Sequence, residues 1–238
     1  MIKMHEILAD GTFLYGWKDE SPLTPIAPSS SYHFIEKKIF SEEECESWNE
    51  YLLKQENILL NYFNQDTENV STKDLAMSVY PDFNLLNDEV FDFHLIPELK
   101  IKIFNGIKTI LSFTDNPAWQ ATLHTTCWFN VLRTGNGMTV HSHNYHKNSL
   151  YGFHVSINAV GTFTSYHHPI KFQEETFRIP NKIGYLTLFP SFIPHGVSLN
   201  RHETPRISIA GDIYPSTVLE SELDTTTNKN NLIEIGNL

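Results

Sequence analysis

The sequence predicts a mainly β protein, a double-stranded β-helix (jelly roll) flanked by N-terminal α-helices. Three observations favour this fold. From about residue 119 onward, short segments rich in Thr, Val, Ile and aromatic residues are separated by turn residues, as in sandwiches and jelly rolls. Before that point, two segments carry apolar residues at helical spacing. The length of 238 residues fits one large domain with a single core.

The N-terminal residues 1–31 are interrupted by glycines, prolines and a run of serines. Such punctuation predicts an arm that packs against the body of the domain. Residues 32–118 are expected to supply one strand and the helical support of the domain. Within this part, residues 32–40 alternate weakly between polar and apolar side chains, which predicts an edge strand.

Two helices are expected in the supporting part. Ser41 and Glu44 have the spacing of a capping box, in which each side chain binds the other residue's backbone amide, and the apolar spacing that follows extends to about Asn61. A second helix is predicted over 96–113, with Leu99, Ile103, Ile107, Ile110 and Leu111 on one side. Residues 77–80 are a candidate short strand.

The jelly-roll core is expected over residues 119–215. Residues 150–160 show the clearest alternation, since large apolar side chains occupy every second position. The polar residues 216–238 predict a partly ordered tail. The complete set of strands predicted for the core is 122–132, 138–143, 150–160, 162–166, 176–179, 184–189, 196–199 and 206–213.

Composition excludes several classes of protein. The formal net charge of −11 disfavours a nucleic-acid partner, because phosphate binding needs clustered Lys and Arg. No run of eighteen apolar residues is present, and the N-terminus lacks the apolar stretch of a secretory leader, so a soluble cytoplasmic protein is expected. Cys45 and Cys127 are too few for a disulfide framework or a thiolate metal site.

Three histidines form the candidate metal site. His141 and His143 are two residues apart, so in a strand both imidazoles point to the same side of the sheet. His195 follows a predicted strand within an apolar Phe-Pro-x-Phe-Ile-Pro frame, a setting that an exposed structural histidine does not need. A third imidazole from a partner strand would complete a facial set of three nitrogen ligands.

Beside this site, Arg206 and Ser208 form a candidate anion clamp. Arg206 lies eleven positions after His195, and Ser208 shares its strand face. A guanidinium gives two parallel charge-assisted hydrogen bonds to a carboxylate, and a hydroxyl adds another. Four further residues are weaker candidates: Asn130 and Tyr151 for binding a co-substrate, and His146 and His154 for binding a substrate.

The motifs resemble those of cupins. The pattern Gly135-x5-His141-x-His143 is similar to the first cupin motif, and Gly184-x5-Pro190 with His195 five residues later is similar to the second. The glutamate that follows the second cupin histidine has no counterpart here, and Phe192 replaces the glycine of the second motif.

A closer resemblance is to the 2-oxoglutarate/Fe(II)-dependent oxygenases. It is strongest to a group whose core has His-x-His, then Phe-Pro-x-x-x-x-His, then Arg-x-Ser, which here are His141 and His143, Phe189 to His195, and Arg206 with Ser208. This likeness covers roughly residues 33–215. It implies that His141 and His195 bind Fe(II), that Arg206 and Ser208 hold the distal carboxylate of 2-oxoglutarate, and that O2 and a small molecule or peptide are the other partners.

Position 143 departs from the family pattern. Most members carry Asp or Glu there, which completes a set of two histidines and one carboxylate. Three outcomes are open: His143 binds the metal, or it leaves a vacant position as in related halogenases, or a more distant carboxylate reaches in. We favour the first, which gives a three-histidine site.

The leading hypothesis is therefore a hydroxylase that uses Fe(II) and 2-oxoglutarate and acts on a C–H bond of a small molecule, amino acid or peptide, with release of succinate and CO2. One alternative is a cupin-like three-histidine dioxygenase or isomerase that does not use 2-oxoglutarate. Another is a binding module that holds a metal without catalysis.

Overall fold

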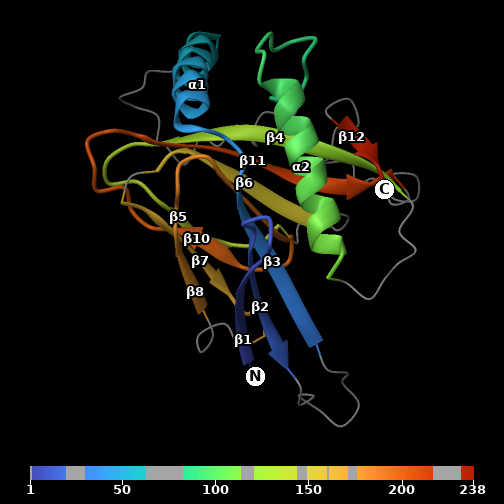
Figure 1. Cartoon of the computed structure of the whole chain (residues 1–238). Coiled ribbons are helices and arrows are strands. Elements are labelled where there is room, and N and C mark those ends of the chain that lie inside the picture. Colours follow the sequence, from blue (N-terminus) through green and yellow to red (C-terminus); the bar gives the residue numbers. More distant parts are fainter. Residues whose placement is uncertain are drawn as a thin grey trace.

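The computed structural model describes residues 2–19, 30–62, 83–113, 121–143, 149–159, 161–170, 176–216 and 232–238. The candidate strand at 77–80 and His146 lie outside these residues. Two antiparallel sheets and two helices make up the described part (Figure 1).

The large sheet has the strand order β1-β2-β3-β9-β6-β11-β4-β12, and the small sheet has the order β5-β10-β7-β8. The large sheet consists of β1 (Ile2–Ile7), β2 (Phe13–Asp19), β3 (Ser30–Lys38), β9 (Tyr185–Pro190), β6 (Tyr151–Asn158), β11 (Arg206–Pro215), β4 (Thr122–Leu132) and β12 (Ile233–Asn237). The small sheet consists of β5 (Met138–His141), β10 (His195–Val197), β7 (Phe163–His167) and β8 (Thr176–Pro180).

The chain alternates between the two sheets from β4 onward. It passes from β4 in the large sheet to β5 in the small one, back to β6, across to β7 and β8, and then through β9, β10 and β11 in the same alternation. This is the connectivity of a jelly roll, because each sheet receives every other segment of the chain. The predicted double-stranded β-helix with N-terminal helices is confirmed.

Strand β11 has apolar side chains on one face of the large sheet and mostly polar side chains on the other. Ile207 and Ile209 are fully buried in the apolar cluster beneath the helices, whereas Arg206, Ser208 and Asp212 occupy the alternate positions. Because side chains alternate across a strand, the polar set points to the opposite face, between the two sheets. The core and the candidate site are thus built from the same strands.

Two helices cover the outer face of the large sheet (Figure 1). Helix α1 (Glu42–Tyr62) begins with the predicted capping box: the Ser41 amide donates to the Glu44 carboxylate at 2.7 Å, and the Glu44 amide donates to the Ser41 hydroxyl at 3.1 Å. Helix α2 (Ile96–Leu111) buries Leu99, Ile103, Ile107 and Ile110, as its spacing predicted.

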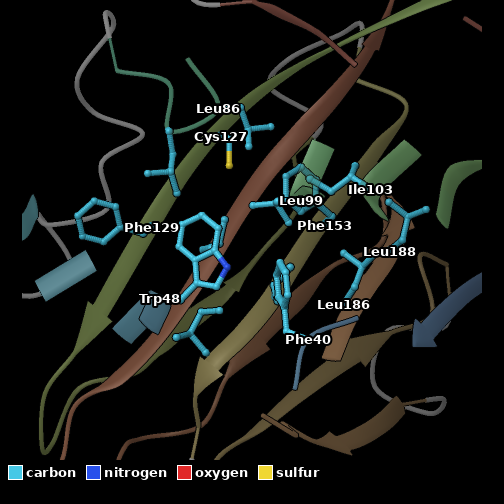
Figure 2. Packing of buried hydrophobic residues seen from close by; sticks show 14 of the residues in the cluster. Phe40, Trp48, Leu86, Leu99, Ile103, Cys127, Phe129, Phe153, Leu186 and Leu188 are labelled. Carbon is cyan, nitrogen blue, oxygen red and sulfur yellow. The ribbon is translucent and has the colours of Figure 1, made fainter. Parts of the chain in front are cut away.

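Figure 2 shows the apolar cluster between these helices and the sheet. Trp48 of α1 and Leu99 of α2 lie close to Phe129 and Phe153, whose side chains come from β4 and β6. All four are fully buried or nearly so. Burial of an aromatic or leucine side chain contributes about 1.5–3 kcal/mol, so this cluster is a principal source of stability.

One expectation at the N-terminus is wrong. Residues 32–40 do not form an edge strand, because β3 pairs with β9 on one side and with β2 on the other. The N-terminal arm does pack on the domain, but as a β1–β2 hairpin that extends the large sheet. The polar tail ends in β12, which pairs with β4. Among the described residues, no helix is long and apolar enough to cross a membrane.

Candidate metal centre

The three candidate histidines come together at one end of the small sheet. His141 ends β5 and His195 begins β10, and the two are direct cross-strand partners. His143 follows two residues after His141, and its backbone amide donates to the carbonyl of Ser191 at 2.9 Å. One ring nitrogen from each histidine lies within 4.8 Å of the others, which is close enough for all three to bind one metal ion.

The loop between β9 and β10 fixes the position of His195. The Ser191 hydroxyl donates to the carbonyl of Ser149 at 2.6 Å, and the Ser191 amide donates to the carbonyl of Leu150 at 3.0 Å. The Ile193 amide donates to Pro190 at 3.0 Å, which closes a tight turn. The prolines of the Phe-Pro-x-Phe-Ile-Pro segment hold their own φ angles, so this turn delivers His195 to the start of β10 with little freedom.

Each imidazole has its Nδ1 facing a hydrogen-bond acceptor. Nδ1 of His141 lies 2.9 Å from the carbonyl oxygen of Thr139, and Nδ1 of His195 lies 3.1 Å from that of Ile193. Nδ1 of His143 contacts the carboxylate of Asp212. A ring nitrogen that faces an acceptor carries the proton, so Nε2 of each ring keeps its lone pair, as a metal ligand requires.

Burial also favours neutral imidazoles at two of these positions. Desolvation lowers the pKa of His141, and it lowers the pKa of His195 well below the ordinary value, where the two neighbouring histidines add to the effect. For His143, burial lowers the pKa, but the charge of Asp212 and its hydrogen bond outweigh burial and raise the pKa overall.

Arg206 supplies a positive charge inside the same cavity. Its side chain is 3% exposed, and Nη1 donates to the Ser208 hydroxyl at 3.1 Å. Among the described residues, Nε has no hydrogen-bond partner and no carboxylate forms an ion pair with the guanidinium. Burial lowers the pKa of Arg206 to about 10, so the group is still charged at neutral pH. A buried cation of this kind is costly unless an anion binds to it.

Other polar groups surround Arg206 on the inner face of the large sheet. Asn130 is opposite Ser208 on the neighbouring strand and is 4% exposed. His154 lies on β6, where its Nε2 is 2.6 Å from the Tyr166 hydroxyl, and its Nδ1 has no hydrogen-bond partner in the part of the chain that the structure describes. Burial, with the charge of Arg206 as a smaller cause, lowers the pKa of His154 to about 3, so this ring is neutral.

One cavity connects the histidines with the arginine. Its wall combines apolar side chains such as Trp128 and Val197 with a larger set of polar and ionisable residues. This polar set consists of Asn130, His141, His143, His154, Thr164, His195, Arg206 and Ser208. A cavity that combines apolar walls with converging polar groups is typical of a small-molecule site.

The sequence-based candidates therefore separate into two sets. His141, His143, His195, Arg206, Ser208, Asn130 and His154 all line this cavity. Tyr151 is not among the residues that line it, and its side chain belongs to the apolar cluster on the helix side. We therefore do not carry Tyr151 forward as a co-substrate ligand.

Two residues at the site were missed from the sequence. Tyr166 holds His154, and Asp212 holds His143. For Asp212 a signal was present, since it lies on the Arg206 and Ser208 face of an otherwise apolar strand and ends that strand's polar series. Neither residue belongs to a local motif, and the contact between Asp212 and His143 spans 69 positions.

Comparison with known proteins gives structural neighbours only. No protein-family model matches the chain, and no curated protein matches it in sequence. The chain is similar to SnoN, a non-haem alpha-ketoglutarate-dependent epimerase from nogalamycin biosynthesis, with a TM-score of 0.51 and 11% identity over 86% of this chain and 90% of SnoN. It is also similar to SnoK, an alpha-ketoglutarate-dependent carbocyclase from the same biosynthesis, with a TM-score of 0.50 and 11% identity over 76% of this chain and 79% of SnoK.

Other neighbours match over shorter regions. An oxidoreductase of the 2OG-Fe(II) oxygenase family from Burkholderia pseudomallei has a TM-score of 0.36 and 13% identity, covering 46% of this chain and 58% of its own. A prolyl-4-hydroxylase from Pseudomonas putida has a TM-score of 0.36 and 15% identity, covering 48% of this chain and 60% of its own. The match thus spans less than two-thirds of either protein. SnoN and SnoK show that this chain shares their fold.

Proposed function

We propose that this chain is an Fe(II)- and 2-oxoglutarate-dependent oxygenase that hydroxylates a C–H bond of a small molecule, amino acid or peptide. The observation that carries the proposal is the buried guanidinium of Arg206, which has no ion-pair partner among the described residues and lies in the same cavity as three converging histidines. A metal site alone does not require a buried cation beside it. A co-substrate that binds the metal at one end and carries a second carboxylate at the other end does require a cation to bind that carboxylate.

The residues present fit both groups. Three neutral nitrogen ligands suit a ferrous ion and leave coordination positions for a chelating ligand. Arg206, Ser208 and Asn130 offer a guanidinium, a hydroxyl and an amide for the distal carboxylate of 2-oxoglutarate, and no other described residue accepts a hydrogen bond from Nε of Arg206. SnoN and SnoK, which share the fold, are described as alpha-ketoglutarate dependent, and SnoN has been solved with Fe3+ and alpha-ketoglutarate.

The chain's own residues perform three tasks in this proposal. His141, His143 and His195 hold the iron, with their Nδ1 protons fixed by acceptors so that Nε2 is free. Arg206 orients 2-oxoglutarate by binding its distal end. The apolar wall limits the access of water to the site. When bound, iron and 2-oxoglutarate supply the oxidising chemistry: one O2 is consumed, the substrate gains a hydroxyl, and 2-oxoglutarate leaves as succinate and CO2.

An anaerobic titration tests this proposal. The metal-free protein is loaded with Fe(II) and titrated with 2-oxoglutarate while the visible charge-transfer band of the chelate is recorded. We expect the band in the wild type, and we expect Arg206→Ala to need at least about 10-fold more 2-oxoglutarate, because a charge-assisted pair in a buried site contributes about 1.5–3 kcal/mol. Arg201→Ala is the matched control, because this substitution removes the same charge from an exposed position.

One alternative is specifically favoured by the histidine set. Three histidines without a carboxylate ligand are also expected of a cupin-like enzyme that does not use 2-oxoglutarate. The same titration separates the two: iron binding without a charge-transfer band, together with substrate turnover in Arg206→Ala, would replace our proposal with the cupin-like one.

A further inference from the structure

The carboxylate of Asp212 lies against the imidazole of His143 inside the protein. Asp212 is 3% exposed, and the only ion pair that it forms among the described residues is with Nδ1 of His143. Its position on β11 puts it on the same inward face as Arg206 and Ser208. The main chain of Asp212 is held independently, because its carbonyl accepts from the Thr125 hydroxyl at 2.9 Å.

The neighbouring strand leaves room for this contact. Gly152 is the register partner of Asp212 on β6. A Cβ atom at Gly152 would lie 3.3 Å from Nδ1 of His143 and 2.8 Å from the ring of Phe189. The absence of a side chain at position 152 therefore lets the His143 ring approach Asp212, and Phe189 closes over the same space.

His143 differs from the other two histidines in its acceptor. His141 and His195 face neutral backbone carbonyls, whereas His143 faces a carboxylate. Hydrogen bonding to a carboxylate fixes the ring's tautomer and orientation, and it increases the electron density at the other nitrogen more than a carbonyl does. His143 should therefore be the strongest donor of the three.

Position 143 is also where the resembled oxygenases carry Asp or Glu. From these observations, and resting on the proposed iron site, we infer that Asp212 is a positioning residue that supplies, through His143, the negative charge that a carboxylate ligand would bring. Three neutral imidazoles contribute no charge to the metal, and Asp212 places one negative charge a single hydrogen bond away. The formal charge around the metal then equals that of a site with two histidines and one carboxylate.

Asp212 is not itself a ligand in this arrangement. The possible metal-ligand atoms that lie within 4.8 Å of one another come from the three histidines, and no carboxylate oxygen of Asp212 belongs to this group. The distant carboxylate that the sequence left open is present, but it reaches the site through His143.

The inference is tested with Co(II), whose affinity and visible ligand-field spectrum report on the metal ligands without 2-oxoglutarate or turnover. In Asp212→Asn the side chain keeps its size and an acceptor but loses its charge. We expect Co(II) to bind about 10- to 100-fold more weakly, with a changed spectrum and little change in the melting temperature of the metal-free protein.

A double-mutant cycle distinguishes this role from a general structural one. In a His143→Asp background, a carboxylate becomes the ligand and Asp212 becomes a repulsive neighbour. Adding Asp212→Asn should then leave the Co(II) affinity unchanged or increase it. Should His143→Asp fail to fold, His143→Ala replaces it: there too, adding Asp212→Asn should leave the affinity unchanged, because the influence of Asp212 runs through His143.

Three results would overturn the inference: equal weakening by Asp212→Asn in both backgrounds, no weakening in the wild-type background, or no Co(II) binding by the wild type. Failure of the proposed function is a separate result. A protein that binds Co(II) in the expected order but gives no 2-oxoglutarate band with Fe(II) keeps the role of Asp212 and loses the proposed activity.

Discussion

Arg206 carries a full positive charge into the interior, where no carboxylate among the described residues forms an ion pair with it and its Nη1 donates to the Ser208 hydroxyl. A residue buried in this way lowers the stability of the ligand-free protein and is retained where a ligand compensates it. Two buried nitrogens without a hydrogen-bond partner among the described residues, Nε of Arg206 and Nδ1 of His154, belong to residues that line the same cavity.

At the residue scale, Arg206→Met should therefore abolish binding of 2-oxoglutarate without lowering the stability of the ligand-free protein. Met has a similar length, contributes no charge and adapts to irregular space. We expect the melting temperature of the ligand-free protein to be unchanged or higher, and the rise in melting temperature on adding Mn(II) with 2-oxoglutarate to disappear. Differential scanning fluorimetry measures both quantities. A large loss of ligand-free stability would instead mean that Arg206 supports the fold.

Gly152 gives a second prediction at this scale. In Gly152→Ala the new Cβ would crowd Phe189 and His143, and overpacking of a filled interior costs about 1–3 kcal/mol. Lower stability to urea and weaker Co(II) binding are both expected. Gly106→Ala is the matched control: it adds a methyl group on helix α2, against the flexible end of Leu186, and should leave Co(II) affinity as it is. If the two variants bind Co(II) alike, Gly152 has no special relation to His143.

At the scale of elements, the strands of the core were predictable because segments rich in β-branched and aromatic residues are separated by turn residues, with the clearest alternation in β6. In β6 every second residue is a large apolar side chain that packs beneath the helices, and in β11 Ile207, Ile209 and Ile213 do the same, with Gly211 between them. The N-terminal strands were not predictable in the same way. The glycines and prolines in residues 1–31 are typical of turns and do not predict strands. The β1–β2 hairpin depends on the pairing of β2 with β3, which no local sequence pattern indicates.

The candidate site divides along the same line. His141 and His143 were found because their spacing is local, and Arg206 with Ser208 for the same reason. Asp212 was assigned no role from the sequence, because its contact with the imidazole of His143 is formed only in the folded chain, between residues that are 69 positions apart. Tyr151 was a candidate because it lies on a strand near the motif, and its place in the helix-side core fits the alternative of core packing.

The first turn of α1 provides a pH prediction. The hydrogen bond from the Ser41 amide lowers the pKa of Glu44 below its ordinary value of 4.5. A group with a depressed pKa in the folded state contributes stability that is present above the ordinary pKa and is lost as the pH falls through the depressed one. Wild type should therefore lose more stability than Glu44→Gln between about pH 6 and pH 3. Urea unfolding at several pH values measures this difference.

A matched control exists on the same helix. Glu46 is exposed and lies outside the capping box, so Glu46→Gln should follow the wild type through the same pH range. Ser41→Ala should cost about 1 kcal/mol at neutral pH through loss of the cap. If Glu44→Gln and Glu46→Gln lose stability in parallel, the cap does not titrate as described.

At the scale of the whole molecule, the site depends on how the two sheets face each other. The candidate metal ligands come from β5 and β10 of the small sheet and the segment that follows β5, whereas Arg206, Ser208, Asp212 and Asn130 come from the large one. A second apolar cluster, which contains Trp17, Phe34, Tyr166 and Phe189, lies between the sheets. The rings of Phe34 and Tyr166 are 4.7 Å apart, so the N-terminal strands support the residue that holds His154.

The C-terminal strand gives a prediction at this scale. Ile233, Ile235 and Leu238 pack partly against the helix-side core, while β12 forms the edge of the large sheet beside β4. Deleting residues 232–238 should lower the free energy of unfolding by about 3 kcal/mol, as expected for three half-buried apolar side chains. Co(II) affinity should be retained, because no residue of β12 lines the cavity. A loss of Co(II) binding in a still folded deletion variant would contradict this independence.

The alternation along β11 also determines which mutations in this strand the protein can tolerate during evolution. Substitutions at positions 206, 208, 210 and 212 alter chemistry while the isoleucines that anchor the strand stay in place. A one-residue insertion or deletion within the strand would do the reverse, turning the guanidinium towards the helices and the isoleucines towards the cavity. New specificities are therefore reachable here by point substitution, whereas changes in strand length remove fold and site together.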